Sequence, residues 1–251
     1  MRWHPDNGGV GHSGQPVVAI MQPTFVPWLG YFDLIDRVDV FVILDDVELS
    51  KQSFQTRNRV QGVLPAPRWL SIRHERKANS SGLIRDVGLV SGRQQFESFS
   101  GTLRNAYPKF PNLDSVLASL GGALTESRSV GELNTRLIRH FMEELGISTP
   151  IQVSSSFTKS PDRSQRLADI VHELDARLYV AVPGALDYIH ADGLQELLSC
   201  DIAIHTHEPV EYRQSHEGFT PYLSVLDAVL EVGADSVLDL VQQGRQALQP
   251  L

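Results

Sequence analysis

Two apolar runs, residues 17–21 and 40–44, constrain the fold of this chain more than any other feature of its sequence. Each run has the length of one β-strand and almost no polar interruption, which is typical of strands buried on both faces of a parallel sheet. Between them stand the turn formers Pro27 and Gly30 and a short amphipathic segment at 29–35. Because parallel strands need a crossover, most often a helix, the sequence predicts a strand–helix–strand unit of an open α/β sheet.

The same alternation continues along the chain. Amphipathic segments with a helical period alternate with short apolar runs, which is the pattern of α/β proteins. The clearest helix is predicted at 132–145, where apolar residues recur every four positions and Gly146 follows as a C-terminal cap. Further strands are predicted at 84–90, 151–153, 178–182 and 202–205, and further helices at 96–106, 113–124, 164–174, 186–189, 225–230 and 236–248.

We therefore expect a mostly parallel, Rossmann-like α/β sheet with helices on both faces, formed by a single domain over residues 17–251. Residues 1–16 are rich in Gly, His, Asn and Pro and are expected to form a flexible leader. Residues 60–72 have the pattern of a hairpin-like or extended region broken by two prolines. The region 62–112 is interpreted as an insertion or cap between two α/β halves.

Composition narrows the class of protein. Hydrophobic residues make up 41% of the chain and charged residues 21%, as in an ordinary soluble globular protein. No apolar run approaches the roughly 20 residues needed to span a bilayer, and the first residues have no apolar segment of a secretory signal. A single cysteine, Cys200, excludes an internal disulfide and a multi-cysteine metal site. We expect a cytoplasmic protein without a membrane span, in which Cys200 serves packing.

The formal net charge of −8 argues against nucleic acid as a partner, because surfaces that bind nucleic acid are normally basic. Positive charge is nevertheless concentrated in the N-terminal third, at Arg57, Arg59, Arg68 and Arg73. Such a cluster suits an anionic ligand, and a solvated face accounts for it as well.

The segment from Gln22 to Tyr31 leads from the end of the first strand into a helix start. Backbone N–H groups at a helix N-terminus suit a phosphate or a carboxylate. The layout is similar to that of nucleotidyltransferases, in which a Gly-His pair at the helix start grips a triphosphate. Here that place holds Gly30 and Tyr31, and no basic residue replaces the histidine. The alternative is that Pro27 and Gly30 only shape a turn while the neighbouring aromatic residues pack.

Asp45 and Asp46 follow the second apolar run directly. The carboxyl end of a buried strand is where α/β folds place ribose binders, metal ligands and general bases. Because adjacent strand residues point to opposite faces, only one of the two is expected to face a cleft. The alternative is a helix N-cap beside a surface charge.

A cationic and polar group, Lys51, Arg57, Asn58 and Arg59, follows the aspartates. Arginine forks bind carboxylate or phosphate through two parallel hydrogen bonds. In an extended chain Arg57 and Arg59 share one face and Asn58 lies opposite. The two arginines are equally suited to pair with the preceding aspartates, which would make their role structural.

Near the C-terminus, His205 and His207 share one face of a predicted strand end. With Asp227 or Glu208 they could form a site of two histidines and one carboxylate for a metal. One of them could instead act as a general base, and a solvated or core histidine is the default interpretation. We expect no metal.

A run of three serines at 154–156 precedes Lys159, Arg163 and Arg166. It has the character of a Ser-rich loop that opens a helix. Its simplest interpretation is a helix N-cap.

The motifs that contain these groups point to a family. The chain reads Q-P, P and G-Y-F, then D-x-F-V and D-D-V, then K and R-N-R, and near the C-terminus Y-x-Q followed by F-x-P-x-L-S-x-L-D. In this order the motifs resemble those of the WbqC-like family of bacterial proteins. The matching residues are Gln22, Pro23, Pro27, Gly30, Tyr31, Phe32, Asp39, Phe41, Val42, Asp45, Asp46, Val47, Lys51, Arg57, Asn58, Arg59, Tyr212, Gln214, Phe219, Pro221, Leu223, Ser224, Leu226 and Asp227.

The resemblance implies a biosynthetic role. Similar proteins are encoded among O-antigen and other surface-glycan genes, and glycyl or other acyl transfer onto a sugar has been suggested for some. We therefore expect a transferase that moves an acyl or aminoacyl group to an amine of a sugar or another small molecule, in glycan or secondary-metabolite biosynthesis. A nucleotide-dependent transferase of the nucleotidyltransferase type and a non-catalytic pathway protein are the alternatives. The expected partner is a small molecule, either a sugar nucleotide or a carrier-bound acyl group, and the cofactor and the oligomeric state stay open.

Acyl transfer assigns roles to the candidate residues. It needs a base for the amine, a group that stabilises the oxyanion and a grip for an anionic substrate. No Ser-His-Asp or Cys-His signature is present, which favours direct transfer without a covalent acyl-enzyme. Both motif regions are expected to converge on one cleft at the carboxyl edge of the sheet. The expected catalytic residues are Asp45, Asp46, Gln22 and Tyr212, and the expected substrate-binding residues are Lys51, Arg57, Asn58, Arg59, Gln214, Asp227 and Tyr31.

Overall fold

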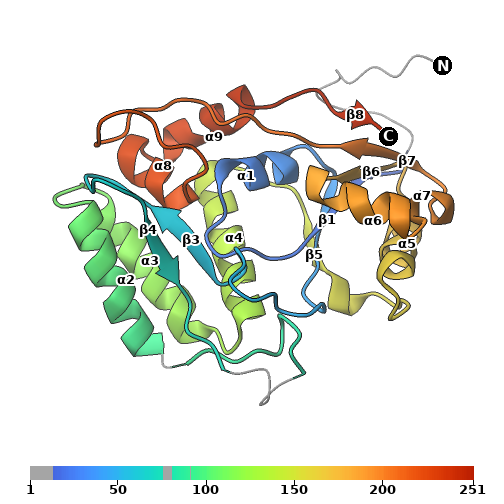
Figure 1. Ribbon diagram of the computed structural model, residues 1–251, viewed down its shortest axis with the longest axis horizontal. Coiled ribbons are helices and arrows are strands. Elements are labelled where there is room, and N and C mark those ends of the chain that lie inside the picture. Colours follow the sequence, from blue (N-terminus) through green and yellow to red (C-terminus); the bar gives the residue numbers. More distant parts are fainter. Residues whose placement is uncertain (1–13, 76–80, 91) are drawn as a thin grey trace.

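The chain is built on a six-stranded sheet with helices on both sides (Figure 1). A computed structural model describes residues 14–75, 81–90 and 92–251, so most of the expected leader lies outside the described residues. The sheet has the order β5-β2-β1-β6-β7-β8. Its strands are β1 (Val17–Met21), β2 (Val40–Ile43), β5 (Ile151–Val153), β6 (Leu178–Ala181), β7 (Asp201–Ile204) and β8 (Gln249–Pro250).

The strand order of this sheet reverses between β1 and β6. Strands β1, β2, β5, β6 and β7 are parallel, and β8 pairs antiparallel with β7. The chain builds outward from β1 through β2 to β5, and it then returns to the other side of β1 to add β6 and β7. Open α/β sheets bind ligands at such a reversal, beyond the carboxyl ends of the strands. The Rossmann-like arrangement confirms the predicted fold class.

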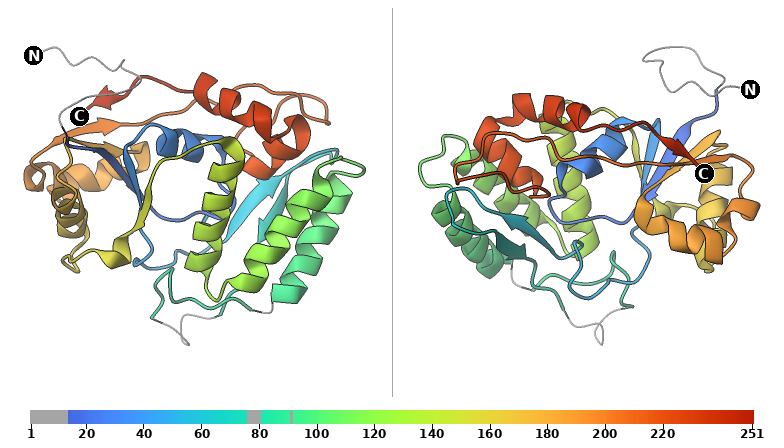
Figure 2. Two further views of the ribbon diagram at one scale, coloured as in Figure 1. Left: turned by 180° about the vertical axis from the view of Figure 1, so that it is seen from behind. Right: turned by 45° about the horizontal axis from the view of Figure 1, so that its top comes forward.

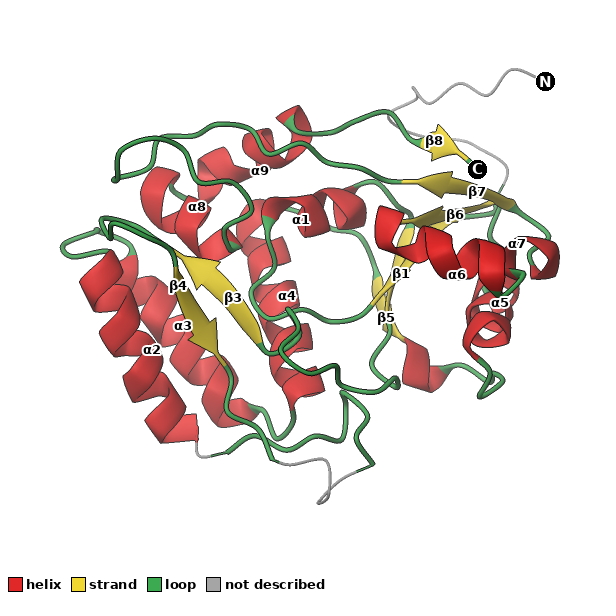
Figure 3. Ribbon diagram, viewed as in Figure 1, coloured by secondary structure: helices red, strands yellow, loops and turns green. Residues whose placement is uncertain are grey.

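Alternate residues of β1 enter two different hydrophobic cores, because neighbouring strand residues point to opposite faces. Val17 and Ala19 pack in the core that contains α1 (Leu29–Asp36) and α4 (Val130–Leu145). Val18 and Ile20 pack in the core that contains α5 (Arg163–Glu173). Figures 2 and 3 show the sheet edge-on between these two layers. The first core also takes up α8 (Val225–Val232) and α9 (Ala234–Gln243), and the second takes up α6 (Leu186–Ala191) and α7 (Leu194–Leu197).

A second, two-stranded sheet forms within the region that was expected to be extended. β3 (Arg57–Val60) and β4 (Arg68–Ser71) pair as an antiparallel hairpin, which is packed beside α2 (Gly92–Ala106) and α3 (Leu113–Glu126) (Figure 3). Buried apolar residues of α2 and α3 belong to the same core as β1 and β2.

The predicted strand at 84–90 is wrong. These residues form a turn, in which the N–H groups of Asp86 and Val87 both donate to the carbonyl of Leu83. The turn buries both Ile84 and Val87 in the same core. These residues are three positions apart, and in a strand they would point to opposite faces. Within the described residues its strand pairing is limited to isolated bridges, such as the one that joins Leu89 to His74, and single hydrogen bonds, such as that from the N–H of Arg85 to the carbonyl of Asp45, add to them.

Helix ends follow local capping chemistry. The predicted helix at 132–145 is confirmed as α4, which begins with Ser129 accepting from the N–H of Glu132 and ends at Gly146 with φ 73°. The predicted helix at 236–248 is shorter, because α9 ends at Gln243 and the chain turns at Gly244. A Cβ at Gly244 would lie 2.4 Å from the ring of His207, so only glycine lets the chain pass there. Among the described residues no helix is both long and apolar enough to cross a membrane.

Candidate functional site

A cavity of about 600 Å³ opens where the strand order reverses, beyond the carboxyl ends of β1 and β6. We call it the switch-point cavity. Its walls come from the segment that follows β1, the segment that follows β2, the start of α5 and the short 3₁₀ turn Pro183–Ala185 after β6. It is lined by Ile20, Met21, Gln22, Thr24, Leu44, Val47, Glu48, Ser50, Arg163, Arg166, Leu167, Tyr179, Val182, Gly184 and Ala185.

Gln22 is held in place at this cavity by two neighbours, Gln55 and Tyr31. Its Oε1 accepts a hydrogen bond of 2.5 Å from Nε2 of Gln55, whose own Oε1 accepts from the N–H of Ser50 at 2.9 Å. Its backbone carbonyl accepts from the hydroxyl of Tyr31 at 3.1 Å. Within the part of the chain that the structure describes, Nε2 of Gln22 makes no hydrogen bond. The amide therefore retains two N–H donors for a ligand.

Positive charge reaches the cavity from the first turns of α5. The guanidinium of Arg166 donates to the carbonyls of Pro161 at 2.9 Å and of Asp46 at 3.4 Å. Among the described residues it forms no ion pair with a carboxylate, so it is suited to bind an anion. Arg163 lines the cavity as well.

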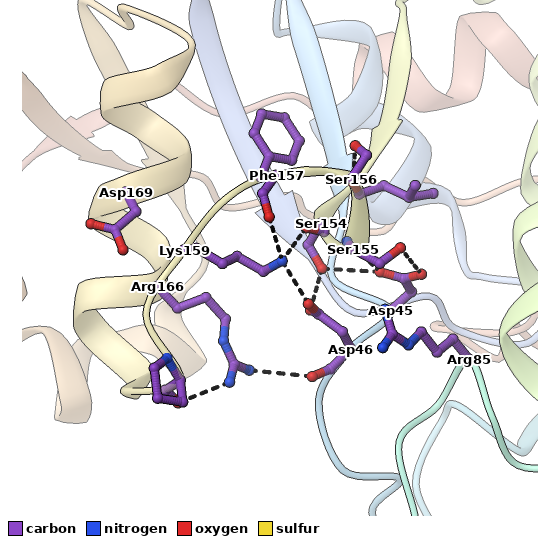
Figure 4. A network of polar contacts seen from close by, with 12 residues as sticks. Asp45, Asp46, Arg85, Ser154, Ser155, Ser156, Phe157, Lys159, Arg166 and Asp169 are labelled. Carbon is purple, nitrogen blue, oxygen red and sulfur yellow. Dashed lines mark hydrogen bonds and ion pairs between the residues drawn. The ribbon is translucent and has the colours of Figure 1, made fainter. Parts of the chain in front are cut away.

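A buried polar network stands behind this wall, between the end of β2 and the loop that follows β5 (Figure 4). Oδ2 of Asp46 lies 2.7 Å from Nζ of Lys159, and Oδ1 accepts from the hydroxyl of Ser154. Burial acts to raise the pKa of Asp46, but the hydrogen bonds from Lys159 and Ser154 outweigh it and lower that pKa. The ammonium of Lys159 also donates to the carbonyls of Ser154 and Phe157, so all three of its N–H groups are used.

Asp45 faces away from the switch-point cavity. Its carboxylate accepts hydrogen bonds from the N–H and the hydroxyl of Ser155, at 3.0 and 2.8 Å, and lies 3.0 Å from the hydroxyl of Ser154, whose one proton it shares with Asp46. It lines a different cavity, of about 710 Å³, with Arg85 and Arg136. Neither aspartate lines the switch-point cavity, and both carboxylates reach the same hydroxyl of Ser154, so they do not point to opposite faces.

The arginines of the R-N-R motif lie on the exposed face of the β3–β4 hairpin. The guanidinium of Arg57 lies 4.4 Å from the ring centroid of Trp69, and that of Arg59 lies 6.0 Å from it. Arg59 also donates to the carbonyls of Pro221 and Tyr222. No ion pair between these arginines and the two aspartates occurs among the described residues.

The other motif residues near this hairpin differ in exposure. Asn58 is buried on the opposite face of β3 and donates to the carbonyls of Phe25 and Val26 at 3.2 and 2.9 Å. Lys51 is exposed in the loop that precedes β3. Asn58 thus fixes the segment that leaves β1, and its amide is not available to a substrate.

The C-terminal motif, residues 212–227, makes contacts that hold the fold together. Asp227 is fully buried and accepts from the N–H groups of Gln61 and Gly62 at 3.1 and 3.2 Å, and from the hydroxyls of Tyr107 and Tyr212. Burial and the Asp227 charge raise the pKa of Tyr212. These contacts tie α8 to the end of β3.

Gln214 closes a loop with Thr220, donating to its carbonyl at 3.1 Å and accepting from its N–H at 2.8 Å. Tyr31 is buried, with its hydroxyl on the carbonyl of Gln22. Of the residues that were expected to share one cleft, only Gln22 lines the switch-point cavity. Tyr212 lines a narrow recess elsewhere, beside Trp28 and His207.

The start of α1 is covered by an aromatic side chain. A Cβ on Gly30 would lie 2.3 Å from the indole of Trp28, so glycine is needed for this ring to fold back over the helix start. The indole packs against the first turn of α1, on the side to which a Cβ of residue 30 would point. The alternative interpretation, a turn with packed aromatic residues, describes this segment.

Sequence reasoning missed a buried network around Asp33. Oδ2 of Asp33 lies 2.7 Å from Nε2 of His205, and Oδ1 accepts from Nε of Arg245 at 2.7 Å. Arg245 also donates to Asp36 at 2.6 Å. Burial acts to raise the pKa of Asp33, but the hydrogen bonds from His205 and Arg245 lower it. The available signal was one carboxylate on the otherwise apolar face of α1.

His205 and His207 line a third cavity, of about 250 Å³, which shares Met21 and Val182 with the switch-point cavity. We call it the β7 cavity. The carboxylate beside His205 is Asp33, and Asp227, which the sequence offered as a metal ligand, is bound elsewhere. Among the described residues no group of three or more His, Cys, Asp or Glu side chains is arranged to hold a metal ion. Burial raises the pKa of the Cys200 thiol, which argues against a thiolate nucleophile.

Among known protein families, the model of the WbqC-like protein family matches residues 22–238. A protein of Mycobacterium tuberculosis that is described as uncharacterized is 30% identical over 225 residues, which cover 87% of this chain and 95% of that protein. No solved structure matches this chain.

Proposed function

The chain belongs to the WbqC-like protein family, and from this premise we propose that it is a biosynthetic transferase that moves an acyl or aminoacyl group, such as glycyl, to an amine of a sugar or another small molecule. The acyl donor and the amine acceptor meet at the switch-point cavity. The pathway that this reaction serves makes a glycan or a secondary metabolite.

The observation that carries this proposal is the position of the cavity. It opens between β1 and β6, beyond the carboxyl ends of the strands and at the reversal of strand order. This is the place where open α/β sheets bind their ligands. A volume of about 600 Å³ lies within the range of sites for small molecules and cofactors.

The side chains of the cavity fit a substrate that carries a phosphate. Arg166 has a guanidinium without a carboxylate partner among the described residues, and Gln22 has free amide donors beside it in the same cavity. A sugar nucleotide and a carrier-bound acyl group both present a phosphate, so both fit this chemistry. The network of Asp46 and Lys159 supports the wall from behind and does not contact the substrate.

The reaction is an attack of the amine on the acyl carbonyl. The bond between carbon and nitrogen forms, the bond from the carbonyl carbon to the donor's sulfur or oxygen breaks, and the amine loses a proton. In this proposal an amide N–H of Gln22 donates to the oxygen on which negative charge develops. The helix start after β1 has Gly30 and Tyr31 where a nucleotidyltransferase has Gly-His, with no basic residue in place of the histidine, which favours acyl transfer over nucleotidyl transfer.

Calorimetric titration with uridine diphosphate tests the anion grip. We expect the wild type to bind and Arg166→Gln to bind about 10-fold to 100-fold more weakly, because a hydrogen bond to a charged group contributes about 1.5–3 kcal/mol. Arg93→Gln is the matched control, since Arg93 is exposed on α2. Binding of phosphopantetheine in place of uridine diphosphate would point to a carrier as the donor. Equal affinity of the wild type and Arg166→Gln for both probes would refute the proposed grip.

A further inference from the structure

Two imidazole rings line the β7 cavity, and Nδ1 of each makes no hydrogen bond within the described residues. His205 is 3% exposed and His207 is 8% exposed, and both line this cavity of about 250 Å³. Nearly all buried polar atoms in proteins have a hydrogen-bond partner, so this pair of rings calls for an explanation. Nδ1 of His207 is fully buried, so Nδ1 of His205 is the nitrogen that a ligand in the cavity can reach. The contacts of each ring determine which nitrogen is free.

The carboxylate of Asp33 fixes the tautomer of His205. Asp33 is fully buried and its two oxygens face Nε2 of His205 and Nε of Arg245, each at 2.7 Å. An ionised carboxylate can only accept hydrogen bonds, so Nε2 of His205 carries the hydrogen. In the neutral ring the lone pair is therefore on Nδ1, and Nδ1 makes no hydrogen bond within the described part of the chain.

A backbone carbonyl fixes the tautomer of His207 in the same way. Its Nε2 lies 3.0 Å from the carbonyl of Val241, which can only accept, so Nε2 again carries the hydrogen. Nδ1 of His207 is buried without a partner. Burial lowers the pKa of His207, which keeps the ring neutral and its lone pair free.

The remaining walls are mostly apolar, and Thr206 adds one hydroxyl, which can both donate and accept. Leu34, Val182 and Pro183 line it together with the indole of Trp28, which meets the ring of His207 edge-on at 5.3 Å between centroids. A phosphate or a carboxylate would face the lone pair of His205 and a mostly apolar wall. A primary amine or its ammonium ion offers N–H donors to that lone pair and a cation to the aromatic face.

We propose that the β7 cavity holds the amine of the acceptor, and that His205 is the catalytic base that takes its proton. The proposal rests on the transfer reaction proposed above, and it assigns that reaction a second subsite. Met21 and Val182 line both cavities, so the β7 cavity that holds the amine lies beside the switch-point cavity that holds the donor's carbonyl. Asp33 and Arg245 are positioning residues, because they act on the substrate only through the ring of His205.

In this step Nδ1 of His205 takes one proton from the amine nitrogen as its bond to the carbonyl carbon forms. The ring becomes an imidazolium, which the buried carboxylate of Asp33 stabilises, as in other His–Asp pairs. The bond from the carbonyl carbon to the donor's sulfur or oxygen then breaks. The leaving sulfur or oxygen receives the proton from Nδ1, so the ring returns to its neutral form and no other reagent is consumed.

Long-range proton–nitrogen NMR of the imidazole rings tests the acceptor subsite without any turnover. The probe is methylamine, titrated into the wild-type protein, and single His→Gln variants assign the resonances of the nine histidines. We expect His205 and His207 to carry hydrogen on Nε2, and methylamine to shift the Nδ1 resonance of His205. The resonances of His172, which is exposed at the end of α5, should not move. Hydrogen on Nδ1 of His205, or no shift at saturating methylamine, would overturn the proposal.

Turnover of His205→Gln tests the base. The glutamine side chain replaces Nε2 and can still donate to Asp33, but it has no counterpart of Nδ1. With a glycyl thioester as donor and glucosamine as acceptor, we expect a loss of about 10²-fold to 10⁴-fold in kcat. His172→Gln is the control. Asp33→Asn should lower kcat, and the hydrogen of the His205 ring should no longer be confined to Nε2. The affinity for uridine diphosphate should stay unchanged.

The two proposals fail in different ways. Normal turnover by His205→Gln would remove His205 as the base and leave the transfer reaction standing. A wild type that neither transfers glycine nor binds uridine diphosphate would contradict the proposed function. In that case the methylamine titration still decides whether the β7 cavity binds amines.

Discussion

Oδ2 of Asp46 lies 2.7 Å from Nζ of Lys159, and this ion pair joins the end of β2 to the loop between β5 and α5. Both side chains are nearly buried, at 11% and 9% exposure. Arg166 donates to the backbone carbonyl of the same aspartate, so the pair also places the arginine that lines the switch-point cavity. Asp46, an aspartate of the family motif, thus supports the wall of the switch-point cavity without lining it.

Lys159→Met should destabilise the protein. It leaves the carboxylate of Asp46 buried without its cation, and breaking a buried pair on one side costs about 3–5 kcal/mol. The free energy of unfolding in urea measures the loss. The control is Arg93→Gln, which removes an exposed pair with Glu97 and should cost no more than about 1 kcal/mol. A loss for Lys159→Met that is no larger than that of the control would show that the pair does not hold the loop.

The same pair predicts an acid dependence of stability. The pKa of Asp46 in the folded protein lies below its ordinary value of 3.8, so the unfolded chain binds the proton more readily. The stabilisation is therefore complete above the unfolded value and is lost as the pH falls through the folded one. Unfolding free energies at a series of pH values below about 5 should fall less steeply for Asp46→Asn than for the wild type. Parallel curves would contradict this assignment.

Much of the fold was predictable from the sequence because strands and helices depend on local patterns. The apolar runs before Gln22 and Asp45 became β1 and β2, and the four-residue spacing before Gly146 became α4. The turn at Ile84 was misassigned as a strand. The apolar residues of this segment do not reveal that Ile84 and Val87, three positions apart in the sequence, are buried in the same core.

The candidate site was less predictable because it depends on contacts between distant parts of the chain. The sequence placed Gln22 at a strand end, and in the structure Gln22 follows β1 directly and lines the cavity. Nothing local to His205 reveals that its partner is Asp33, which stands 172 residues earlier. Likewise the buried carboxylate of Asp227 accepts hydrogen bonds from the hydroxyls of Tyr107 and Tyr212, of which Tyr107 lies far from it in the sequence. The sequence suggested Asp227 as a ligand, whereas in the structure its carboxylate anchors α8 to the end of β3.

Tyr212→Phe tests whether this anchor is structural. Loss of the 2.8 Å hydrogen bond to the carboxylate of Asp227 should lower the free energy of unfolding by about 1.5–3 kcal/mol. The affinity for uridine diphosphate should not change, since Tyr212 does not line the switch-point cavity. The experiment pairs urea unfolding with calorimetry. Weaker binding of uridine diphosphate with an unchanged free energy of unfolding would show that Tyr212 belongs to the substrate site.

Gly30→Ala tests the packing of Trp28 over the start of α1. The new methyl group would lie 2.3 Å from the indole, so the ring must move or the backbone must shift, at a cost of about 1–3 kcal/mol. Gly122→Ala is the matched control, because Gly122 is an exposed helical glycine with open space around it, and alanine there should stabilise the protein by up to about 1 kcal/mol. Thermal unfolding of both variants gives the comparison. Equal shifts in the same direction would show that Trp28 does not restrict this position.

The central claim is that the substrate binds where the strand order reverses, and a crystal structure with uridine diphosphate tests it most directly. The account predicts the diphosphate in the switch-point cavity, within hydrogen-bond distance of the guanidinium of Arg166 and the amide of Gln22. Uridine diphosphate stacked on Trp69 beside Arg57, or seated in the cavity that Asp45 lines, would contradict the account.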